Sequence, residues 1–351
     1  MAEGLEFGAF LKNWAGRSDT RSDIAETVRA IGEASLRIRE VVARGPLEIP
    51  PDRLSDPSMS HDADFETVLD TIAIGIIEEA LQSAPVVALA AEQMERPVGL
   101  DRERRLLVAV DPLDGSTNLD TNAAIGTIFS VLPRPSGDID VFSPEAFLQS
   151  GEHQLAAGFV VYGPRTTLVI TLRDGTHMFT RDPGTNRYFL TNESIQIPPL
   201  AREYAINASN YRHWDEATRT YVDDCLKGAE GVRAFDFNMR WIGSLVAEIY
   251  RIFSRGGIYL YPADRRDGHA QGRLRLIHEA NPISLVVENA GGASSTGRQR
   301  ILELKPKELQ QKIPIVVGSR DEVEYVLRLY TQPHALGERS PLFGNRGLFR
   351  M

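Results

Sequence analysis

The sequence predicts a layered α/β protein of two domains, and three observations lead to this expectation. Short apolar runs suited to strands recur in the first part, at 85–90, 105–110, 126–132, 155–162, 166–172, 175–180 and 186–191. Amphipathic segments typical of helices precede them at 22–43 and 64–83. After Pro198-Pro199, expected helices (214–227, 243–255, 277–290, 320–330) alternate with expected strands (203–208, 257–261, 313–317). We therefore expect domains at 1–200 and 201–335, followed by a tail at 336–351.

Local patterns justify the individual elements. Ser22 or Asp23 can cap the first helix, and its broad apolar face is formed by Ile24, Val28, Ile31, Leu36, Ile38 and Val41. Residues 44–62 are rich in Pro, Asp and Ser and predict a loop before the second helix. Residues 133–153 are polar and turn-rich, which predicts a surface loop. Asp182-Pro183-Gly184 predicts a hairpin turn between the last two strands of the first domain.

Composition and charge exclude several classes of protein. The chain has 351 residues, 42% hydrophobic and 25% charged, which is ordinary for a globular protein. Its net charge of -9 argues against nucleic acid as a partner. The apolar runs fall short of the roughly 20 residues that cross a bilayer, and the N-terminus lacks a secretory pattern, so we expect a cytoplasmic protein without a membrane segment. Cys225 is the only cysteine, which excludes an intrachain disulfide.

The residues best suited to chemistry lie in Asp111-Pro112-Leu113-Asp114-Gly115-Ser116-Thr117-Asn118, directly after the apolar run 106–110. We expect a buried strand to deliver two carboxylates into a tight turn. Carboxylates suit hard cations such as Mg²⁺, and Leu113 is free to offer its carbonyl oxygen. The amides of a Gly-Ser-Thr chain reversal suit a phosphate. Asp-Pro and Asp-Gly are also ordinary turn dipeptides, so this segment alone leaves a structural turn equally open.

This segment, DPLDGSTN, resembles the signature of the metal-dependent, lithium-sensitive phosphomonoesterases, and its DPLDGS form is similar to class 1 fructose-1,6-bisphosphatases. Four further segments agree: GTIF at 126–129, GIYLYP at 257–262, RLRL at 273–276 leading to EANP at 279–282, and AGGA at 290–293. The resemblance covers roughly residues 8–331. It implies a homotetramer that hydrolyses the 1-phosphate of fructose 1,6-bisphosphate, in gluconeogenesis or a Calvin-type cycle. It also implies two or three Mg²⁺ ions per subunit, with Mn²⁺ as a substitute.

The resemblance further assigns catalytic and metal-binding roles. The metal ligands would be Glu92, Asp111, the carbonyl of Leu113, Asp114 and Glu279, with Glu92 bridging ions. Asp70, together with Asp64, would help to activate the attacking water, and Glu92 would take part in the same catalytic group. Simpler roles remain open for single residues: a helix cap for Asp64, a solvated strand-end charge for Glu92, and for Glu279 a helix-start carboxylate favoured by the helix dipole.

The substrate contacts implied by the resemblance form two groups. Asp114, Gly115, Ser116 and Thr117 would contact the reacting 1-phosphate. Asn207, Tyr211, Tyr261 and Arg273 would hold the remote phosphate, and Arg240 would be donated across a subunit interface. An ordinary surface arginine and an ordinary strand tyrosine are the structural alternatives for Arg240 and Tyr261.

Three residues depart from the family pattern. Arg273 stands where many members have Lys, so a planar guanidinium group would replace a compact ammonium group at the phosphate. Trp241 stands where Tyr is common, which puts one hydroxyl contact to phosphate in doubt. Gln93 follows Glu92 where a second Glu is common. Because a neutral amide cannot act as a base, more of the water activation falls on Asp70.

The residues that match the regulatory AMP site of the family also differ in this sequence. Arg21, Ala25, Arg105-Leu106 and Pro133 stand at the matching places, so we expect weak or absent inhibition by AMP. The single cysteine excludes the redox control of chloroplast forms, which needs paired cysteines.

Other functions remain alternatives. The nearest is a sedoheptulose-1,7-bisphosphatase or a dual-specificity enzyme, because the sequence does not fix the sugar length. An inositol-phosphate or nucleotide phosphatase of the wider superfamily is disfavoured by the second phosphate cluster. A non-catalytic, metabolite-sensing protein on the same fold is disfavoured by the retained carboxylates. His278-Glu279 lacks the second histidine of a zincin motif, and Ser116 lacks a Gly-x-Ser-x-Gly elbow.

Overall fold

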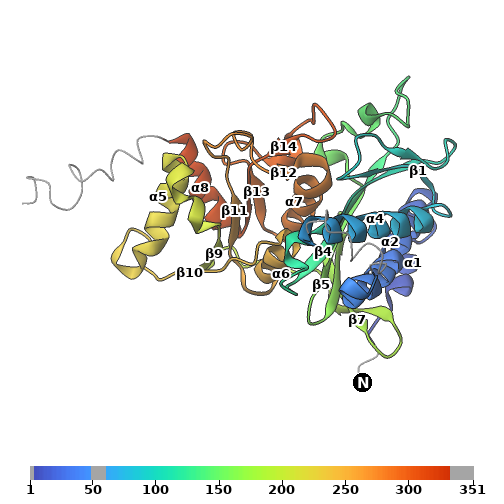
Figure 1. The fold of residues 1–351 in the computed structure, drawn as a ribbon, viewed down its shortest axis with the longest axis horizontal. Coiled ribbons are helices and arrows are strands. Elements are labelled where there is room, and N and C mark those ends of the chain that lie inside the picture. Colours follow the sequence, from blue (N-terminus) through green and yellow to red (C-terminus); the bar gives the residue numbers. More distant parts are fainter. Residues whose placement is uncertain (1–3, 49–60, 333–351) are drawn as a thin grey trace, which may run out of the picture.

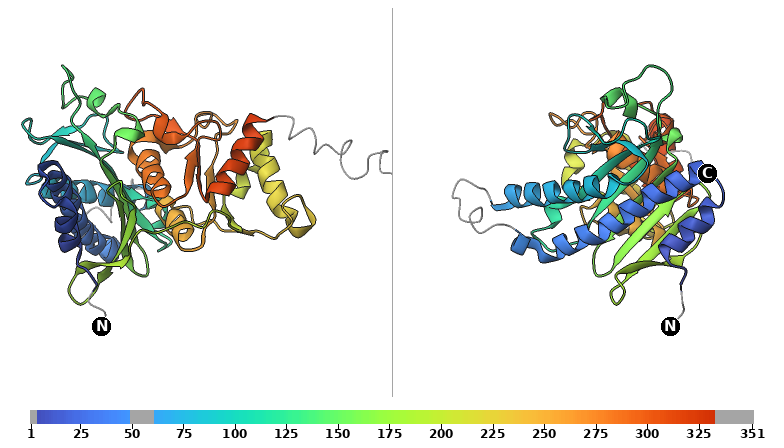
Figure 2. Two further views of the ribbon diagram at one scale, coloured as in Figure 1. Left: turned by 180° about the vertical axis from the view of Figure 1, so that it is seen from behind. Right: turned by 90° about the vertical axis from the view of Figure 1, so that its right-hand side faces the viewer.

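The computed structural model describes residues 4–48 and 61–332, without the side chains of residues 48 and 61–65. Layers of helices and sheets alternate along the long axis of the molecule (Figure 1). The outer helical layer holds α1 (Phe7–Ala15), α2 (Asp19–Arg44) and α4 (His61–Leu81). Figure 2 shows these helices running across one face of the large sheet. The predicted tail and most of the predicted loop at 44–62 lie outside the described residues.

The large sheet has eight strands in the order β2-β1-β3-β4-β5-β6-β7-β8. Its strands are β1 (Val86–Ala91), β2 (Val98–Gly99), β3 (Leu106–Asp114), β4 (Ile125–Pro133), β5 (Ala156–Tyr162), β6 (Thr166–Thr171), β7 (Thr176–Asp182) and β8 (Arg187–Asn192). β1 and β3 pair in parallel, and from β3 to β8 every neighbouring pair is antiparallel. The position of β3, third in this order with a partner on each side, places the carboxylates of its last residues inside the protein rather than at a sheet edge.

The second half of the chain forms the remaining layers. α6 (Leu245–Arg255), the π-helical turn η7 (Leu276–Ala280) and α7 (Asn281–Glu288) lie between the sheets. The second sheet has the order β10-β9-β11-β15-β13, with β9 (Glu203–Ala205), β10 (Asn238–Met239), β11 (Ile258–Tyr261), β13 (Ala293–Ser295) and β15 (Ile315–Gly318). α5 (Glu216–Leu226) and α8 (Arg320–Thr331) cover its far face. β12 (Leu274–Arg275) and β14 (Lys312–Ile313) form a small separate ribbon.

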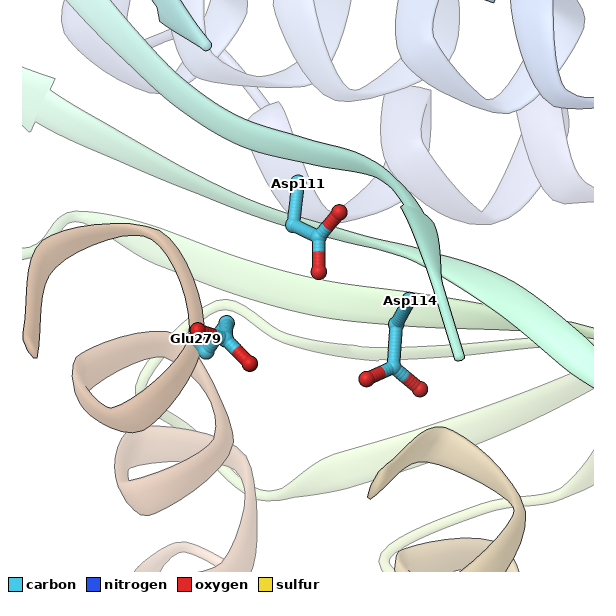
Figure 3. Close-up of side chains that lie close together, drawn as sticks. All are labelled: Asp111, Asp114 and Glu279. Carbon is cyan, nitrogen blue, oxygen red and sulfur yellow. The ribbon is translucent and has the colours of Figure 1, made fainter. Parts of the chain in front are cut away.

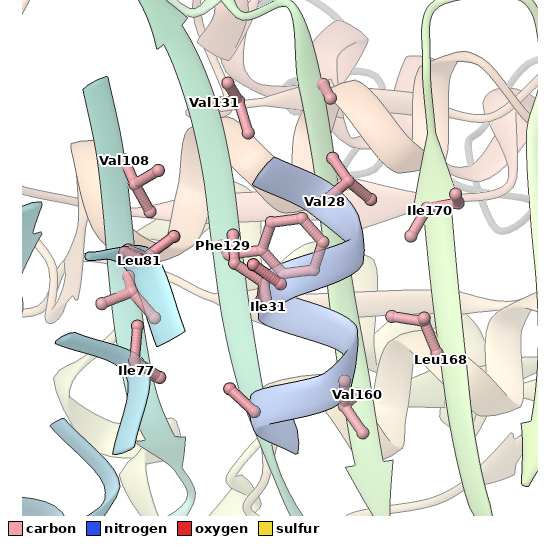
Figure 4. Packing of buried hydrophobic residues seen from close by; sticks show 14 of the residues in the cluster. Val28, Ile31, Ile77, Leu81, Val108, Phe129, Val131, Val160, Leu168 and Ile170 are labelled. Atoms are coloured by element: carbon pink, nitrogen blue, oxygen red, sulfur yellow. The ribbon is translucent and has the colours of Figure 1, made fainter. Parts of the chain in front are cut away.

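The core forms on both faces of the large sheet because successive strand residues point to opposite sides. Phe129 of β4 packs with Val28 and Ile31 of α2, on the face that α4 also covers (Figure 4). Its neighbour Ile128 belongs to the opposite core, together with Ile249 of α6 and residues of α7. Both β4 residues have no exposed surface. The sheet is therefore sandwiched between helices, in agreement with the expected layered α/β class.

The expected layered α/β class is confirmed, and several local expectations are wrong. α1 was not predicted, because nine residues give too short a periodic signal. The expected strand at 203–208 ends at Ala205 and continues into a 3₁₀-helix, η5 (Ala208–His213). The expected surface loop 133–153 contains short helices, η3 (Pro144–Phe147) and η4 (Gly151–His153), and its Phe147 is fully buried. The predicted turn at Asp182 does join β7 to β8. In the described parts of the chain, no helix is long and apolar enough to span a bilayer.

Candidate active site

Three buried carboxylates from both halves of the chain meet at one point. Asp111 and Asp114 come from the end of β3 and Glu279 from η7, and one oxygen of each lies within 4.8 Å of the others (Figure 3). In a regular strand, residues three apart point to opposite faces. Here Asp111 pairs with Ile128 while Asp114 pairs with Gly126, so β3 carries one extra residue. This bulge turns both carboxylates toward the same side.

The turn of the motif begins later than predicted. Asp111 and Asp114 belong to the strand, and the chain reverses only at Gly115, whose φ is 74°. A β-carbon at this position would lie 2.7 Å from Cβ of Ser244, so only glycine fits without strain. Ser116 and Thr117 then form the short 3₁₀-helix η2 (Ser116–Asn118). Their hydroxyls and amides therefore follow directly after the two carboxylates.

Glu279 reaches the centre because the chain takes a wide π-helical turn there. Pro282, at the start of α7, has no N–H to donate to the carbonyl of residue 278, which favours this wider turn. The backbone N–H of Arg275 donates to Glu279 Oε2 over 2.6 Å and fixes the carboxylate. The expected helix at 277–290 is thus a π-turn followed by a short α-helix. The zincin motif would need a histidine at position 282, where this chain has the proline that favours the wide turn.

The electrostatics of the three carboxylates suit a bound cation. Burial, and then the charge of Glu92, raise the pKa of Asp111 and of Glu279 well above their usual ranges. Burial raises the pKa of Asp114 to about 6, although Val246 N and Ser244 Oγ donate to its Oδ2 over 2.9 Å and 3.0 Å. Within the described part of the chain, Oδ1 of Asp111 is buried without a hydrogen-bond partner. Buried carboxylates of this kind need a counterion, and an all-oxygen set fits a hard cation such as Mg²⁺.

Glu92 follows β1 and is held by an arginine that the sequence analysis did not single out. Arg275 Nη1 donates to Glu92 Oε1 over 2.5 Å, and Arg275 Nε donates to Gln310 Oε1 over 2.5 Å. Gln310 Nε2 in turn donates to the carbonyl of Met94 over 2.7 Å. The charge of Glu92 acts on all three central carboxylates, which places it beside them. Leu113 lies buried between the two aspartates in β3.

α4 adds two more carboxylates. Burial, followed by the charge of Glu92, raises the pKa of Asp70 to about 7, while a hydrogen bond from Gln93 lowers it. Glu66, one helical turn earlier, accepts a hydrogen bond from Ser116 Oγ over 3.2 Å. Glu66 was not predicted, because an acidic residue on a helix carries no signal of what it faces. The side chain of Asp64 lies outside the described residues.

An aromatic cluster lies next to the carboxylates. Trp241 stacks on Tyr259 at 5.9 Å and also contacts Tyr261, and the guanidinium of Arg273 lies 5.7 Å from the Tyr261 ring. Burial and then the charge of Asp114 raise the pKa of Tyr259, which shows that the cluster adjoins the carboxylates. Rings and a cation at this place suit a sugar and its phosphate.

The other predicted substrate residues, Asn207, Tyr211 and Arg240, make contacts in different places. Asn207 and Tyr261 line one small hollow, and Asn207 Oδ1 accepts hydrogen bonds from the amide and hydroxyl of Ser209. Tyr211 donates its hydroxyl to Asp223 Oδ1 over 2.9 Å. Arg240 is half-exposed, and its Nε lies 3.8 Å from Glu203 Oε1. In this chain Arg240 is therefore engaged with Glu203 on the surface.

Comparisons with known proteins agree with this geometry. Buried carboxylates beside a glycine-led turn, on a layered α/β fold, suit the metal-assisted hydrolysis of a phosphate ester. Residues 58–193 match the fructose-1-6-bisphosphatase N-terminal domain model, and residues 197–331 match the C-terminal domain model. The chain belongs to the class 1 fructose-1,6-bisphosphatase family of phosphoric monoester hydrolases.

Individual relatives match over nearly their whole length. The class 1 fructose-1,6-bisphosphatase of Rhizobium meliloti (strain 1021) is 51% identical, covering 99% of both chains. That of Azorhizobium caulinodans is 50% identical, covering 92% of this chain and 98% of the relative. The holo form of Leishmania major fructose-1,6-bisphosphatase superposes with a TM-score of 0.83 at 28% identity, covering 94% of this chain and 100% of that structure.

Proposed function

We propose that this chain hydrolyses fructose 1,6-bisphosphate to fructose 6-phosphate and phosphate, with Mg²⁺ as the cofactor. The observation that carries the proposal is the convergence of Asp111, Asp114 and Glu279 within 4.8 Å, directly before the Gly115 turn. The full-length similarity to fructose-1,6-bisphosphatases supports the choice of substrate. Mn²⁺ has the same preference for oxygen ligands and should substitute.

Each predicted site residue has a part in this reaction. Asp111, Asp114, Glu279, Glu92 and the carbonyl of Leu113 would hold two or three Mg²⁺ ions. When bound, Mg²⁺ supplies positive charge to the phosphoryl oxygens and lowers the pKa of the attacking water. Gly115, Ser116 and Thr117 would bind the 1-phosphate through amides and hydroxyls, with Asp114 beside them. Asp70, whose pKa is about 7, is suited to accept the proton of the water, assisted by Asp64 and Glu92.

The remote phosphate would be held by residues of the C-terminal half. Asn207, Tyr211, Tyr261 and Arg273 would bind it, and Arg240 would arrive from a neighbouring subunit of a homotetramer. We assign the 1-phosphate and most metal ligands to a domain at 1–200. A second domain at 201–335 would hold the sugar and remote phosphate and contribute Glu279 to the metal. Gluconeogenesis or a Calvin-type cycle in the cytoplasm would employ this activity. The altered residues Arg21, Ala25, Arg105 and Pro133 support weak or absent inhibition, so AMP at micromolar concentration should leave the rate unchanged.

Phosphate release tests this function. The kcat/KM for fructose 1,6-bisphosphate, measured with Mg²⁺, should exceed that for sedoheptulose 1,7-bisphosphate and for inositol 1-phosphate. A higher value for the seven-carbon sugar would favour the alternative bisphosphatase. No Mg²⁺-dependent release from any of the three would favour the non-catalytic alternative.

A further inference from the structure

Arg233 is a buried cation at the end of the molecule that α5 and α8 form. Its side chain is 8% exposed, and its Nη2 donates to Oε1 of the fully buried Glu322 over 2.5 Å. The hydroxyl of Tyr221 donates to the other oxygen of Glu322 over 2.9 Å. Tyr221 belongs to α5 and Glu322 to α8, two helices that lie side by side (Figure 1). The ion pair therefore attaches the segment between α5 and α6, which carries Arg233, to both helices.

Four aromatic rings surround the guanidinium of Arg233. The centres of the Tyr325 and Phe237 rings lie 4.3 Å and 4.6 Å from its Cζ. Those of Phe235 and Tyr221 lie 5.5 Å and 6.0 Å away. Phe235 and Phe237 follow Arg233 at every second position, and the two residues between them are exposed. Three alternate side chains of one segment thus form a single cluster, and rings over a guanidinium add attraction to the ion pair.

This cluster fixes a position more than it adds stability. A buried ion pair contributes little net stability, because removing two charges from water offsets most of their attraction. Residues 231–237, all within the described chain, belong to no helix or strand, so a ladder of backbone hydrogen bonds does not set their place. The side chains around Arg233 therefore determine where the residues that follow begin.

Arg240 lies between this cluster and a second anchor. Directly after Phe237, β10 pairs with β9 over two residues. The next residue is Arg240, whose side chain is half-exposed and whose backbone N–H donates to the carbonyl of Tyr204 over 2.8 Å. Beyond it, Trp241 stacks on Tyr259 beside the carboxylate site. The guanidinium of Arg240 is thus presented from a short stretch of chain that is held at both ends.

We propose that Arg233 is a positioning residue for the remote phosphate, because it fixes the segment that presents Arg240. This inference rests on the proposed function, in which Arg240 reaches the remote phosphate of a neighbouring subunit. Arg233 is buried and acts only through Arg240. Holding the backbone of Arg240 in advance reduces the entropy that is lost when the phosphate binds.

Phosphate release with Mg²⁺ tests the proposal on fructose 1,6-bisphosphate and on fructose 1-phosphate, which lacks the remote phosphate. The anchor variant is Arg233→Ala with Glu322→Gln, so that no unpaired carboxylate is buried. For the bisphosphate its KM should rise by about fivefold or more with kcat little changed, the pattern of lost binding. For fructose 1-phosphate kcat/KM should stay at the wild-type value. Arg320→Ala with Glu324→Gln, the same two changes at exposed positions of α8, should match the wild type.

Two further variants separate positioning from general stability. In an Arg240→Gln background the anchor changes should have little additional effect on the KM for the bisphosphate, because residues that act through one contact are not additive. Arg233→Lys retains a positive charge beside Glu322 and should recover part of the affinity, which excludes a folding defect as the cause.

Amide hydrogen exchange of the full-length protein tests the anchoring without any substrate. Residues 238–242 should exchange about tenfold faster in the anchor variant, whereas β3 should exchange as in the wild type. Equal exchange at 238–242 in both proteins, equal losses on both substrates, or effects that add to those of Arg240→Gln would each overturn the proposal. A wild type that releases no phosphate from the bisphosphate would contradict the proposed function instead, and the exchange rates would still decide whether Arg233 holds the segment.

Discussion

Asp111 has a buried side chain that its described protein surroundings leave partly unsatisfied. Its carboxylate is buried, one oxygen has no hydrogen-bond partner among the described residues, and the neighbouring carboxylates raise its pKa further after burial. A residue in this situation costs folding free energy unless a cation compensates it. At the scale of single residues, the site is therefore built for a ligand at the expense of stability.

Asp111→Asn separates the contribution of this carboxylate to catalysis from its cost in stability. The amide keeps the shape but removes the charge, so kcat for phosphate release should fall by about 100-fold or more, the size expected when one electrostatic contact to a transition state is lost. The metal-free variant should melt at the same or a higher temperature than the metal-free wild type, because one repulsive charge is gone. Retained activity would refute the assignment of Asp111 as a metal ligand.

We expect Glu66 to compete with a bound phosphate for the hydroxyl of Ser116. Ser116 has a single O–H to donate, and in this structure it donates to Glu66 Oε2. A phosphate bound at the Gly115 turn would need the same proton and would also be repelled by the carboxylate.

We expect Glu66→Gln to tighten phosphate binding. The inhibition constant of inorganic phosphate and the KM should both fall by about two- to fivefold, which corresponds to about 0.4–1 kcal/mol of removed repulsion. In a Ser116→Ala background the same change should have a smaller effect, because the shared hydroxyl is gone. Glu79→Gln, an exposed change on the same helix, serves as the control. An unchanged phosphate constant in Glu66→Gln would contradict the competition.

At the scale of elements, the conformation at the end of β3 depends on the close packing of Gly115 against Ser244. The bulge turns Asp111 and Asp114 to the same side, and Gly115 then passes against Ser244 at the start of α6. Ser244 also donates to Asp114, so Gly115 and Ser244 together hold the Asp114 carboxylate in place.

Gly115→Ala should disrupt this contact. The positive φ and the clash with Ser244 should lower the free energy of unfolding by about 1–3 kcal/mol, measured in denaturant, and should weaken metal binding. Gly137→Ala is a matched control, because Gly137 has a φ of 88° but nothing within 4 Å of its added carbon. If both variants lose the same stability and Gly115→Ala binds metal normally, the contact with Ser244 has no role.

Most strands were predictable because their apolar runs are local and continuous. The bulge in β3 was not, because no residue pattern marks a register shift that depends on the pairing with β4. The burial of Phe147 was missed for a related reason: its partners, such as Leu107 and Ile277, lie far away in sequence. In the site, the motif indicated Asp111 and Asp114, whereas Arg275, Ser244 and Glu66 act through contacts that only the fold brings together.

At the scale of the whole molecule, the metal-free site should make stability fall as pH rises. The pKa of Asp114 is raised from 3.8 to about 6 and that of Asp70 from 3.8 to about 7. The folded state therefore holds protons that the unfolded chain has already released, and this contribution is lost between about pH 4 and pH 7. Each unit of such a shift corresponds to about 1.4 kcal/mol, less where solvent screens the group.

Thermal melting with a chelator should show this dependence. The Tm should be lower at about pH 8 than at about pH 5.5, and added Mg²⁺ should raise it more at the higher pH. A metal-free Tm that is equal or higher at about pH 8 would mean that other groups dominate the pH dependence.

We propose that both halves of the chain close one metal centre. Calorimetric titration with Mn²⁺ tests it directly on the wild type, on Asp111→Asn from β3 and on Glu279→Gln from η7. Glu303→Gln, an exposed change in the second half of the chain, is the control. We predict that both site variants lose Mn²⁺ affinity by about tenfold or more while the control binds normally. Wild-type affinity in Glu279→Gln, with loss only in Asp111→Asn, would contradict a centre that both halves share.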